Sequence, residues 1–270
     1  MTTATVTAFG RELRRWREAR RSSQFELSLA ADVSQRHLSW LETGRSNPSR
    51  EMVLQLAEAL DLPLRAHNEL LGAAGFAPRY PDQGLDEGDR AEIRRVLQGV
   101  LDAHEPAPAY VVDRSWNLVL ANAATARLIT LLPDPVAAAA AARGNVLRLL
   151  LHPDGLRPHV VNIGEACSVL LGRLRREVIE YGGADDLAAL LAEAEELAGA
   201  ANASAAPPTA GDLAVPLHVE LAGRRLQFLT MIATIGAAHD VTVEELRIET
   251  LLPADEATRT ALAELADRAR

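Results

Sequence analysis

Two adjacent side chains near the N-terminus, Gln35 and Arg36, have the chemistry needed to recognise the edges of nucleic-acid bases. A glutamine amide can form two hydrogen bonds with adenine, and an arginine guanidinium can form two with guanine. Ser34 precedes the pair as a predicted N-cap, and Leu38 and Leu41 follow at helical spacing. The pair is therefore expected on the first turn of a short helix.

Three potential metal ligands lie close together in the middle of the chain: His152, Asp154 and His159. Their spacing matches no helical pattern that would bring the three side chains to one ion. Pro153 and Pro158 lie among them and favour a role in turns. We therefore predict no metal site.

The other reactive groups do not form a catalytic pattern either. Cys167 is the only cysteine and lies at helical spacing with Ile163 and Leu170, which favours a core thiol over a redox sensor. The motifs G-x-S-x-G and H-E-x-x-H and a phosphate-binding glycine loop are absent. We predict no catalytic residues, no enzymatic activity and no cofactor.

The composition is that of a globular protein: of the 270 residues, 48% are hydrophobic and 24% are charged. A single cysteine rules out an internal disulfide framework and fits a reducing compartment. No segment has the length and apolarity of a membrane span, and the N-terminus has no signal-peptide pattern. A cytoplasmic protein without membrane contact is expected.

The net charge of −9 is unevenly distributed along the chain. Residues 1–80 have a net charge of +2, and the remaining residues have a net charge of −11. This asymmetry indicates two domains with different partners. We predict a first domain over 1–80, a linker over 81–88 and a second domain over 89–270.

The first domain is predicted to be all-helical. Apolar residues recur at three- and four-residue spacing in five segments, and Ser23, Ser34 and Ser49 are plausible N-caps. Two short helices joined by a turn, inside a five-helix domain, are typical of a helix-turn-helix module.

The segment from Gln24 to Ser49 carries a family resemblance, most specifically in Leu38-Ser-x-Leu-Glu-Thr-Gly-Arg-Ser-Asn-Pro-Ser. It resembles the phage-repressor-like (Cro/C1, or XRE) helix-turn-helix domains over residues 9–75. The resemblance implies a double-stranded DNA operator as partner, with the third helix in the major groove. The residues it assigns to DNA are Gln24, Ser34, Gln35, Arg36, Ser39, Arg45, Ser46 and Asn47.

The second domain is predicted to be α+β, with an antiparallel sheet of about five strands and helices on one face. A helix is followed by a hairpin over 109–121, a block of helices, and three strands between 215 and 252. This order is PAS-like. Tyr110-Val-Val-Asp-Arg-Ser-Trp-Asn-Leu-Val-Leu-Ala-Asn and Leu147-x-Leu-Leu-Leu-His-Pro-Asp-Gly resemble the MmyB-like regulators, which join these two kinds of domain.

The MmyB-like resemblance implies a small apolar ligand, such as a fatty acid, between the sheet and the helices. Side chains of the hairpin and the apolar strands are expected to reach it. The predicted ligand-binding residues are Tyr110, Val112, Trp116, Leu118, Phe228, Met231 and Ile248.

Two alternatives to a ligand sensor stay open for the second domain. It could be a ligand-free module for dimerisation or protein interaction, or an enzyme fused to a DNA reader. The segment 226–235, apolar on both faces, fits either a cavity or a dimer interface. A homodimer is expected, because operators with two half-sites require two-fold symmetry.

Overall fold

The computed structural model describes residues 6–85, 90–199 and 216–268, and the chain divides into two compact units. The first unit comprises Met1–Gln83 together with Val178–Ala184 and Gly236–Glu244, and the second comprises the remainder. The predicted start of the second domain at Asp89 lies outside the described residues.

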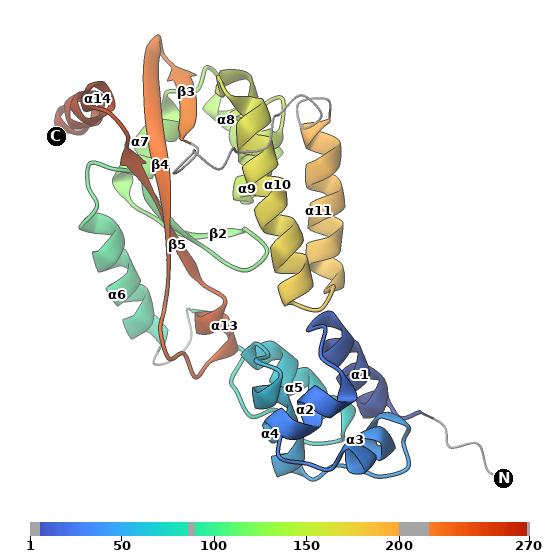
Figure 1. Cartoon of the computed structure of the whole chain (residues 1–270). Helices are drawn as coiled ribbons and strands as arrows, with labels where there is room; N and C mark the ends of the chain where they lie inside the picture. The colour runs from blue at the N-terminus through green and yellow to red at the C-terminus, as the bar shows by residue number, and fades with distance from the viewer. Residues whose placement is uncertain (1–5, 86–89, 200–215, 269–270) are drawn as a thin grey trace. The chain divides into compact units, whose positions relative to one another are not determined.

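The N-terminal part of the first unit consists of five helices (Figure 1). They are α1 (Ala8–Ala19), α2 (Gln24–Ala30), α3 (Gln35–Glu42), α4 (Arg50–Ala59) and α5 (Leu64–Ala73). A hydroxyl accepts a backbone N–H at the start of each of the first four helices, from Thr7, Ser23, Ser34 and Ser49. These caps satisfy N–H groups that have no partner inside the helix. The predicted all-helical domain is confirmed.

The five helices enclose one hydrophobic core, and its two largest members, Trp16 and Phe9, come from α1. Leu27, Leu38 and Leu41 bring α2 and α3 onto this core, with exposed fractions of zero. Gly10 allows α1 to approach the end of α3: a Cβ at Gly10 would lie 2.6 Å from the carbonyl oxygen of Glu42. The third helix is therefore held by close packing as well as by its hydrophobic face.

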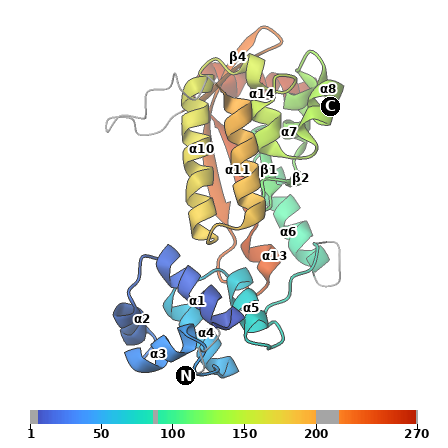
Figure 2. The same cartoon turned by 90° about the vertical axis from the view of Figure 1, so that its right-hand side faces the viewer.

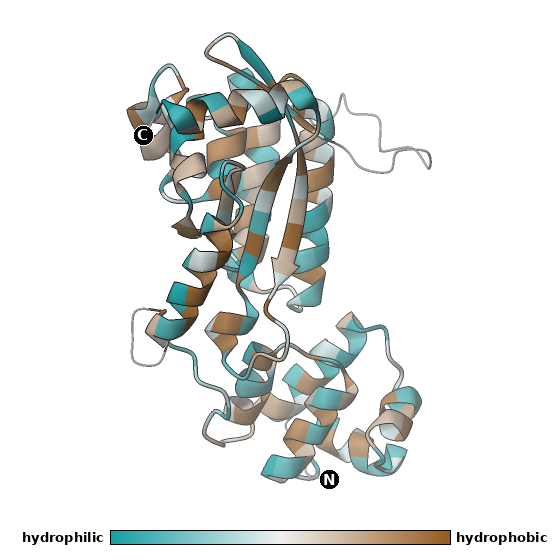
Figure 3. Cartoon of the chain, turned by 90° about the vertical axis from the view of Figure 1, so that its left-hand side faces the viewer, coloured by the Kyte–Doolittle hydropathy of each residue, from teal (hydrophilic) through white to brown (hydrophobic). Residues whose placement is uncertain are grey.

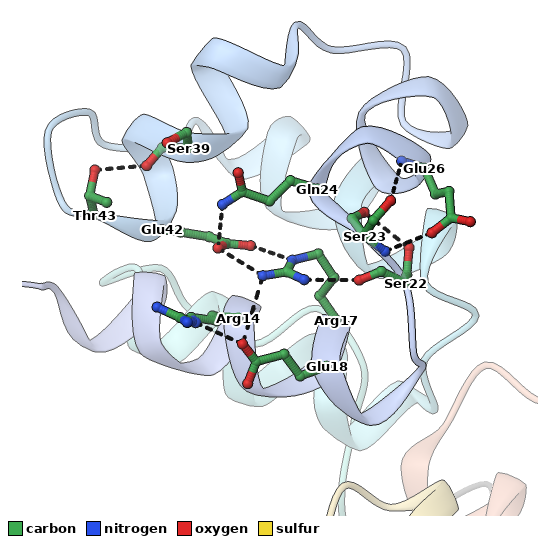
Figure 4. A network of polar contacts seen from close by, with 10 residues as sticks. All are labelled: Arg14, Arg17, Glu18, Ser22, Ser23, Gln24, Glu26, Ser39, Glu42 and Thr43. Carbon is green, nitrogen blue, oxygen red and sulfur yellow. Dashed lines mark hydrogen bonds and ion pairs between the residues drawn. The ribbon is translucent and has the colours of Figure 1, made fainter.

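A buried ion pair also joins α1 to α3 (Figure 4). Arg17 Nε donates to Glu42 Oε1 at 2.6 Å, and Arg17 Nη2 donates to Glu42 Oε2 at 3.1 Å. Gln24 Nε2 adds a third hydrogen bond to Glu42 Oε2, at 2.8 Å. Since the side chains of Arg17 and Glu42 are 10% and 3% exposed, each charge depends on the other for compensation.

The second unit is built on a five-stranded sheet with the order β2-β1-β5-β4-β3. The strands are β1 (Ala109–Val112), β2 (Leu118–Ala121), β3 (Leu217–Leu221), β4 (Arg224–Thr234) and β5 (Arg247–Pro253). Each pair of neighbours is antiparallel. The predicted α+β class and five-stranded antiparallel sheet are confirmed.

Helices cover the sheet of the second unit unequally on its two faces (Figures 1 and 2). Residues of α7 (Ala123–Thr130), α8 (Pro135–Ala142), α9 (Val146–Leu151), α10 (Ile163–Glu180) and α14 (Glu256–Asp267) pack in one core with Phe228 and Leu251. On the other face, α6 (Arg90–Asp102) packs against Ala109, Val111 and Leu246. Most helices thus lie where they were predicted, and α6 adds a smaller second layer.

The remaining helices in the described part of the chain are short or amphipathic. They are the 3-10 helix η1 (Arg157–His159), α11 (Asp185–Ala198) and α13 (Val241–Glu244), and α13 belongs to the first unit. Figure 3 shows hydrophilic and hydrophobic residues following one another along the long strands of the sheet. Within the described part of the chain, no helix has the length and apolarity needed to cross a membrane.

The buried pair of Arg17 and Glu42 predicts that replacing one partner destabilises the protein more than replacing both. Arg17→Met should lower the free energy of unfolding by about 3–5 kcal/mol, because it leaves the buried carboxylate of Glu42 without a counter-charge. The double variant Arg17→Met, Glu42→Met should recover most of that loss, because no unpaired charge remains. Urea unfolding followed by tryptophan fluorescence measures both.

The exposed pair Arg14–Glu18, also on α1, supplies the matched control, since both side chains are more than half exposed. Arg14→Ala should change stability little. A double variant as unstable as Arg17→Met alone would contradict the assignment of the loss to an uncompensated charge.

Candidate nucleic-acid interface and apolar cavity

The first turn of α3 presents an exposed polar surface. Gln35 and Arg36 are exposed, and Ser39 lies one turn further on and is half-buried. Ser34 Oγ accepts the backbone N–H of His37 at 3.1 Å, so this hydroxyl serves as the helix cap. The structure therefore brings an amide and a guanidinium to the end of the helix that enters the groove in helix-turn-helix domains.

Arg36 is positioned by an aromatic ring on its own helix. Its Cζ atom lies 4.5 Å from the centroid of Trp40, which is half-buried. A guanidinium over an indole face is stabilised by the ring quadrupole, and this restricts the rotamers of the arginine. Trp40 thereby orients Arg36, a role that the sequence alone left open.

Gln24 lies at the first position of α2, but its side chain points into the domain (Figure 4). Its amide nitrogen donates to Glu42 instead of extending outward. This hydrogen bond joins α2 to the end of α3, and the predicted contact of Gln24 with a phosphate stays a prediction.

The loop after α3 contains the three remaining predicted residues, Arg45, Ser46 and Asn47. Gly44 adopts a φ of 75°, in the left-handed region that ends helices, and the N–H of Arg45 donates to Trp40 O at 2.8 Å. Arg45 and Asn47 are exposed and Ser46 is half-buried. Since this loop continues directly from the exposed surface of α3, it is well placed for contacts with a sugar-phosphate backbone.

The second unit contains a cavity of about 400 Å³ between its sheet and helices. Its volume lies within the range of small-molecule sites. Strand and hairpin residues in its wall include Tyr110, Trp116, Leu118, Leu217, Leu229 and Ile232, and helical residues include Leu128, Leu147, Leu150, Ala166 and Leu170. Trp116 is 1% exposed, whereas Leu118 and Ile232 are 46% and 44% exposed. The wall of the cavity thus includes partly exposed leucine and isoleucine side chains as well as a buried tryptophan.

Three of the seven predicted ligand-binding residues, Tyr110, Trp116 and Leu118, line this cavity. The other four, Val112, Phe228, Met231 and Ile248, are not among its described wall residues. Val112 follows an irregularity in the β1–β2 pairing, and Phe228 is completely buried in the core beside the cavity.

Met231 and Ile248 also lie outside the described wall of the cavity. Met231 lies between Thr230 and Ile232, which both line the cavity, and is 43% exposed. Ile248 packs with the α6 cluster, and its neighbour Glu249 faces the cavity instead. Because successive side chains of a strand point to opposite faces, Ile248 and Glu249 of β5 lie on different faces of the sheet, and the ligand contact predicted for Ile248 stays a prediction.

The sequence prediction also missed Arg173 and Glu249, the charged residues among the described wall of the cavity. Arg173 Nη1 donates to Glu249 Oε1 at 2.7 Å. The available signal was the spacing of Arg173 and Glu177 on α10 at i and i+4, next to the apolar Leu170 and Leu174. Such a pair is ordinarily a solvated surface pair, so its burial could not be predicted without the fold.

The side chains considered for metal and redox chemistry have structural roles here. His152 Nδ1 accepts the backbone N–H of Asp154 at 3.1 Å, as expected of a turn. Among the described residues, no group of three histidine, cysteine or acidic side chains could hold a metal ion. Cys167 is completely buried, and burial raises the pKa of its thiol.

Comparisons with known proteins identify two family models along the chain. A model described as a helix-turn-helix domain matches residues 8–70. A model described as the MmyB-like transcription regulator ligand binding domain matches residues 93–265. No curated protein matches the chain.

The exposed surface of α3 predicts distinct losses of DNA affinity. Gln35→Ala and Arg36→Ala should each weaken binding to a selected DNA sequence by about 1–3 kcal/mol, because each removes a side chain able to bond a base edge. Arg45→Ala should weaken binding to selected and random DNA alike, because a phosphate contact is independent of sequence. Fluorescence anisotropy titrations at one salt concentration measure these affinities. Equal losses on selected and random DNA for Arg36→Ala would exclude base recognition by this residue.

Proposed function

Because the chain belongs to the MmyB-like family of transcription regulators, we propose that it binds operator DNA in a sequence-specific manner and senses a small apolar ligand. In this proposal residues 1–80 form the DNA-binding domain, residues 81–88 are the linker, and residues 89–270 form the sensing and dimerisation domain. The observation that carries the DNA-binding part is the exposure of Gln35 and Arg36 on the first turn of α3.

The proposed contacts with DNA bases and with the DNA backbone are assigned according to the type and position of each side chain. Gln35, Arg36 and Ser39 would face base edges in the major groove, because they lie on the exposed side of α3. Arg45, Ser46 and Asn47 would contact the phosphate backbone and set the register of the helix. Ser34 and Gln24 would support this surface, one as a cap and the other through its hydrogen bond to Glu42.

The proposed ligand is apolar because the cavity wall is dominated by aliphatic side chains from α7, α9, α10 and the strands. Flexible leucine and valine side chains suit an acyl chain better than a planar or strongly charged molecule. An acyl chain, as in the fatty acid that the family resemblance implies, is therefore the part of the ligand that this cavity supports most directly.

A homodimer is proposed because an operator with two half-sites requires two DNA-binding domains related by two-fold symmetry. Apolar side chains at the end of β4 and in β5 support this: Leu229, Met231, Ile232 and Leu252 are all more than a third exposed. In the described register, β3 pairs with β4 only from Arg224 to Phe228, so the remainder of β4 is paired on one side. A second copy would cover such an apolar edge.

The same exposed residues support a second candidate, in which the C-terminal domain binds a protein partner and no small ligand. Met231 and Leu252 lie outside the described wall of the cavity, so a sensor does not by itself require their exposure. Native mass spectrometry of gently purified protein separates the two candidates. A retained small molecule supports the sensor, and its consistent absence supports the interaction module.

The proposed regulator acts in the cytoplasm without catalysis, metal or cofactor. Ligand in the cavity would favour one placement of the two DNA-binding modules over another, and it can do so only through unequal affinity for the two arrangements. Filling of the cavity would thereby change operator affinity without any contact between ligand and DNA.

The proposed dimer predicts a difference between fragment and full chain. Residues 1–80 should fold but bind a palindromic operator roughly 100-fold more weakly than the full chain, because the two modules no longer bind as a linked pair. Anisotropy titrations at one salt concentration measure both affinities, and circular dichroism checks that the fragment is helical. On DNA with a single half-site the two proteins should bind alike. Equal affinity for the palindrome would exclude dimerisation through the C-terminal domain.

A further inference from the structure

One end of the cavity in the second unit is polar. Tyr110, Arg173 and Glu249 meet there with the ring of Trp116, and they come from β1, α10, β5 and the β1–β2 turn. Arg173 Cζ lies 4.2 Å from the centroid of the Trp116 ring. Since the rest of the described wall is largely aliphatic, any polar group of a ligand would be recognised at this end.

The carboxylate oxygens at this end already have hydrogen-bond donors. Glu249 Oε1 accepts from Arg173 Nη1 at 2.7 Å, and Glu249 Oε2 accepts from the Tyr110 hydroxyl at 3.0 Å. Burial, and after it the neighbouring Glu249 carboxylate, raise the pKa of Tyr110, so the phenol stays protonated and continues to donate. Both oxygens of Glu249 are therefore held in place by donors from β1 and α10.

A second glutamate, Glu177, is satisfied in the same way. Its Oε1 accepts from Arg173 Nε at 2.9 Å and also from Arg247 Nη1, and its Oε2 accepts from Trp116 Nε1 at 2.8 Å. Glu177 and Glu249 are 6% and 2% exposed, and Arg247 is 9% exposed. Two arginines and two glutamates thus form a compact buried cluster whose charges cancel.

One donor in this cluster is unsatisfied. Arg173 Nη2 is buried and has no hydrogen-bond partner among the residues that the structure describes. A buried donor without an acceptor costs about 1–3 kcal/mol, more when it is charged. The guanidinium at the polar end of the cavity therefore keeps one buried nitrogen for which the described residues supply no acceptor.

The charge balance decides which kind of acceptor is suitable. A carboxylate would add a third negative charge beside Glu177 and Glu249, whose charges the two arginines already neutralise. Burial of an uncompensated charge is far more costly than burial of a neutral group that is hydrogen-bonded. An uncharged carbonyl oxygen, in contrast, would satisfy the guanidinium and leave the cluster neutral.

We propose that the cavity selects an apolar chain that ends in an uncharged carbonyl group, such as an ester, amide or lactone, and that Arg173 donates to this carbonyl. This inference rests on the proposed function, because it specifies the head group of the proposed apolar ligand. An acyl chain bound as its free carboxylate is disfavoured by the same cluster.

Displacement of Nile red, a neutral apolar dye, from the full-length protein tests this selection. The competitors are methyl dodecanoate, N-methyldodecanamide and dodecanoic acid at a pH where the acid is ionised, so that only the head group changes. The two neutral compounds should displace the dye at concentrations roughly tenfold or more below that of the acid, which corresponds to at least about 1.4 kcal/mol.

Glu249→Gln tests the role of the charge balance, because glutamine has the same shape as glutamate but no charge. The variant removes one negative charge from the cluster and keeps an oxygen acceptor for Arg173 or Tyr110, so the acid should gain affinity relative to the ester. Glu193→Gln is the matched control, because Glu193 pairs with Arg148 and does not line the cavity. It should leave the order of the three competitors unchanged.

The possible outcomes distinguish a failure of the proposed head-group selection from a failure of the proposed function. A preference of the wild-type protein for dodecanoic acid would overturn the neutral head group and leave an apolar-ligand sensor in place. Failure of Nile red and all three competitors to bind wild-type protein would contradict the apolar ligand itself, and with it the inference. A folded Glu249→Gln variant with the wild-type order of competitors would refute the role of charge balance.

Discussion

The ligand-binding half of the chain depends on how one arginine is accommodated inside it. Arg173 extends from α10 over the ring of Trp116 and bonds two buried glutamates, one on its own helix and one on β5. These contacts join the long helix to the central strand of the sheet and to the β1–β2 turn. A buried guanidinium is tolerated only when its charge and donors are compensated. The cluster therefore fixes where sheet and helices meet and where the apolar cavity ends.

A buried pair of arginine and glutamate also stabilises the DNA-binding half of the chain. Arg17 and Glu42 are buried together, and their pair holds the end of α3 against α1, while Gln24 ties α2 to the same carboxylate. The chain contains no lysine, so every such pair uses the planar guanidinium fork, which can bond several acceptors at once. In one unit this rigidity holds α3, on which Gln35 and Arg36 are exposed, and in the other it sets the polarity of a cavity.

Local signals predicted most of the fold. Serine caps at 23, 34 and 49 marked helix starts that the structure confirms, and alternation of residues marked the strands of the sheet. The sequence could not predict which face of β5 turns inward, because Glu249 and Arg247 look like a solvated face until partners on α10 appear. For the same reason Ile248 was placed at the cavity and Arg173 was not. Contacts between residues far apart in sequence, such as Arg17 with Glu42, leave no periodic pattern to detect.

Sequence-specific DNA binding by α3 of a dimer is the part of the proposed function on which the rest depends. In vitro selection from random double-stranded DNA, with the full-length protein as bait, tests it most directly. A dimer that reads DNA through α3 should enrich an inverted repeat whose half-sites lie about one helical turn apart, or a multiple of it. Recovery of sequences with no shared motif, at an affinity equal to that for random DNA, would contradict it.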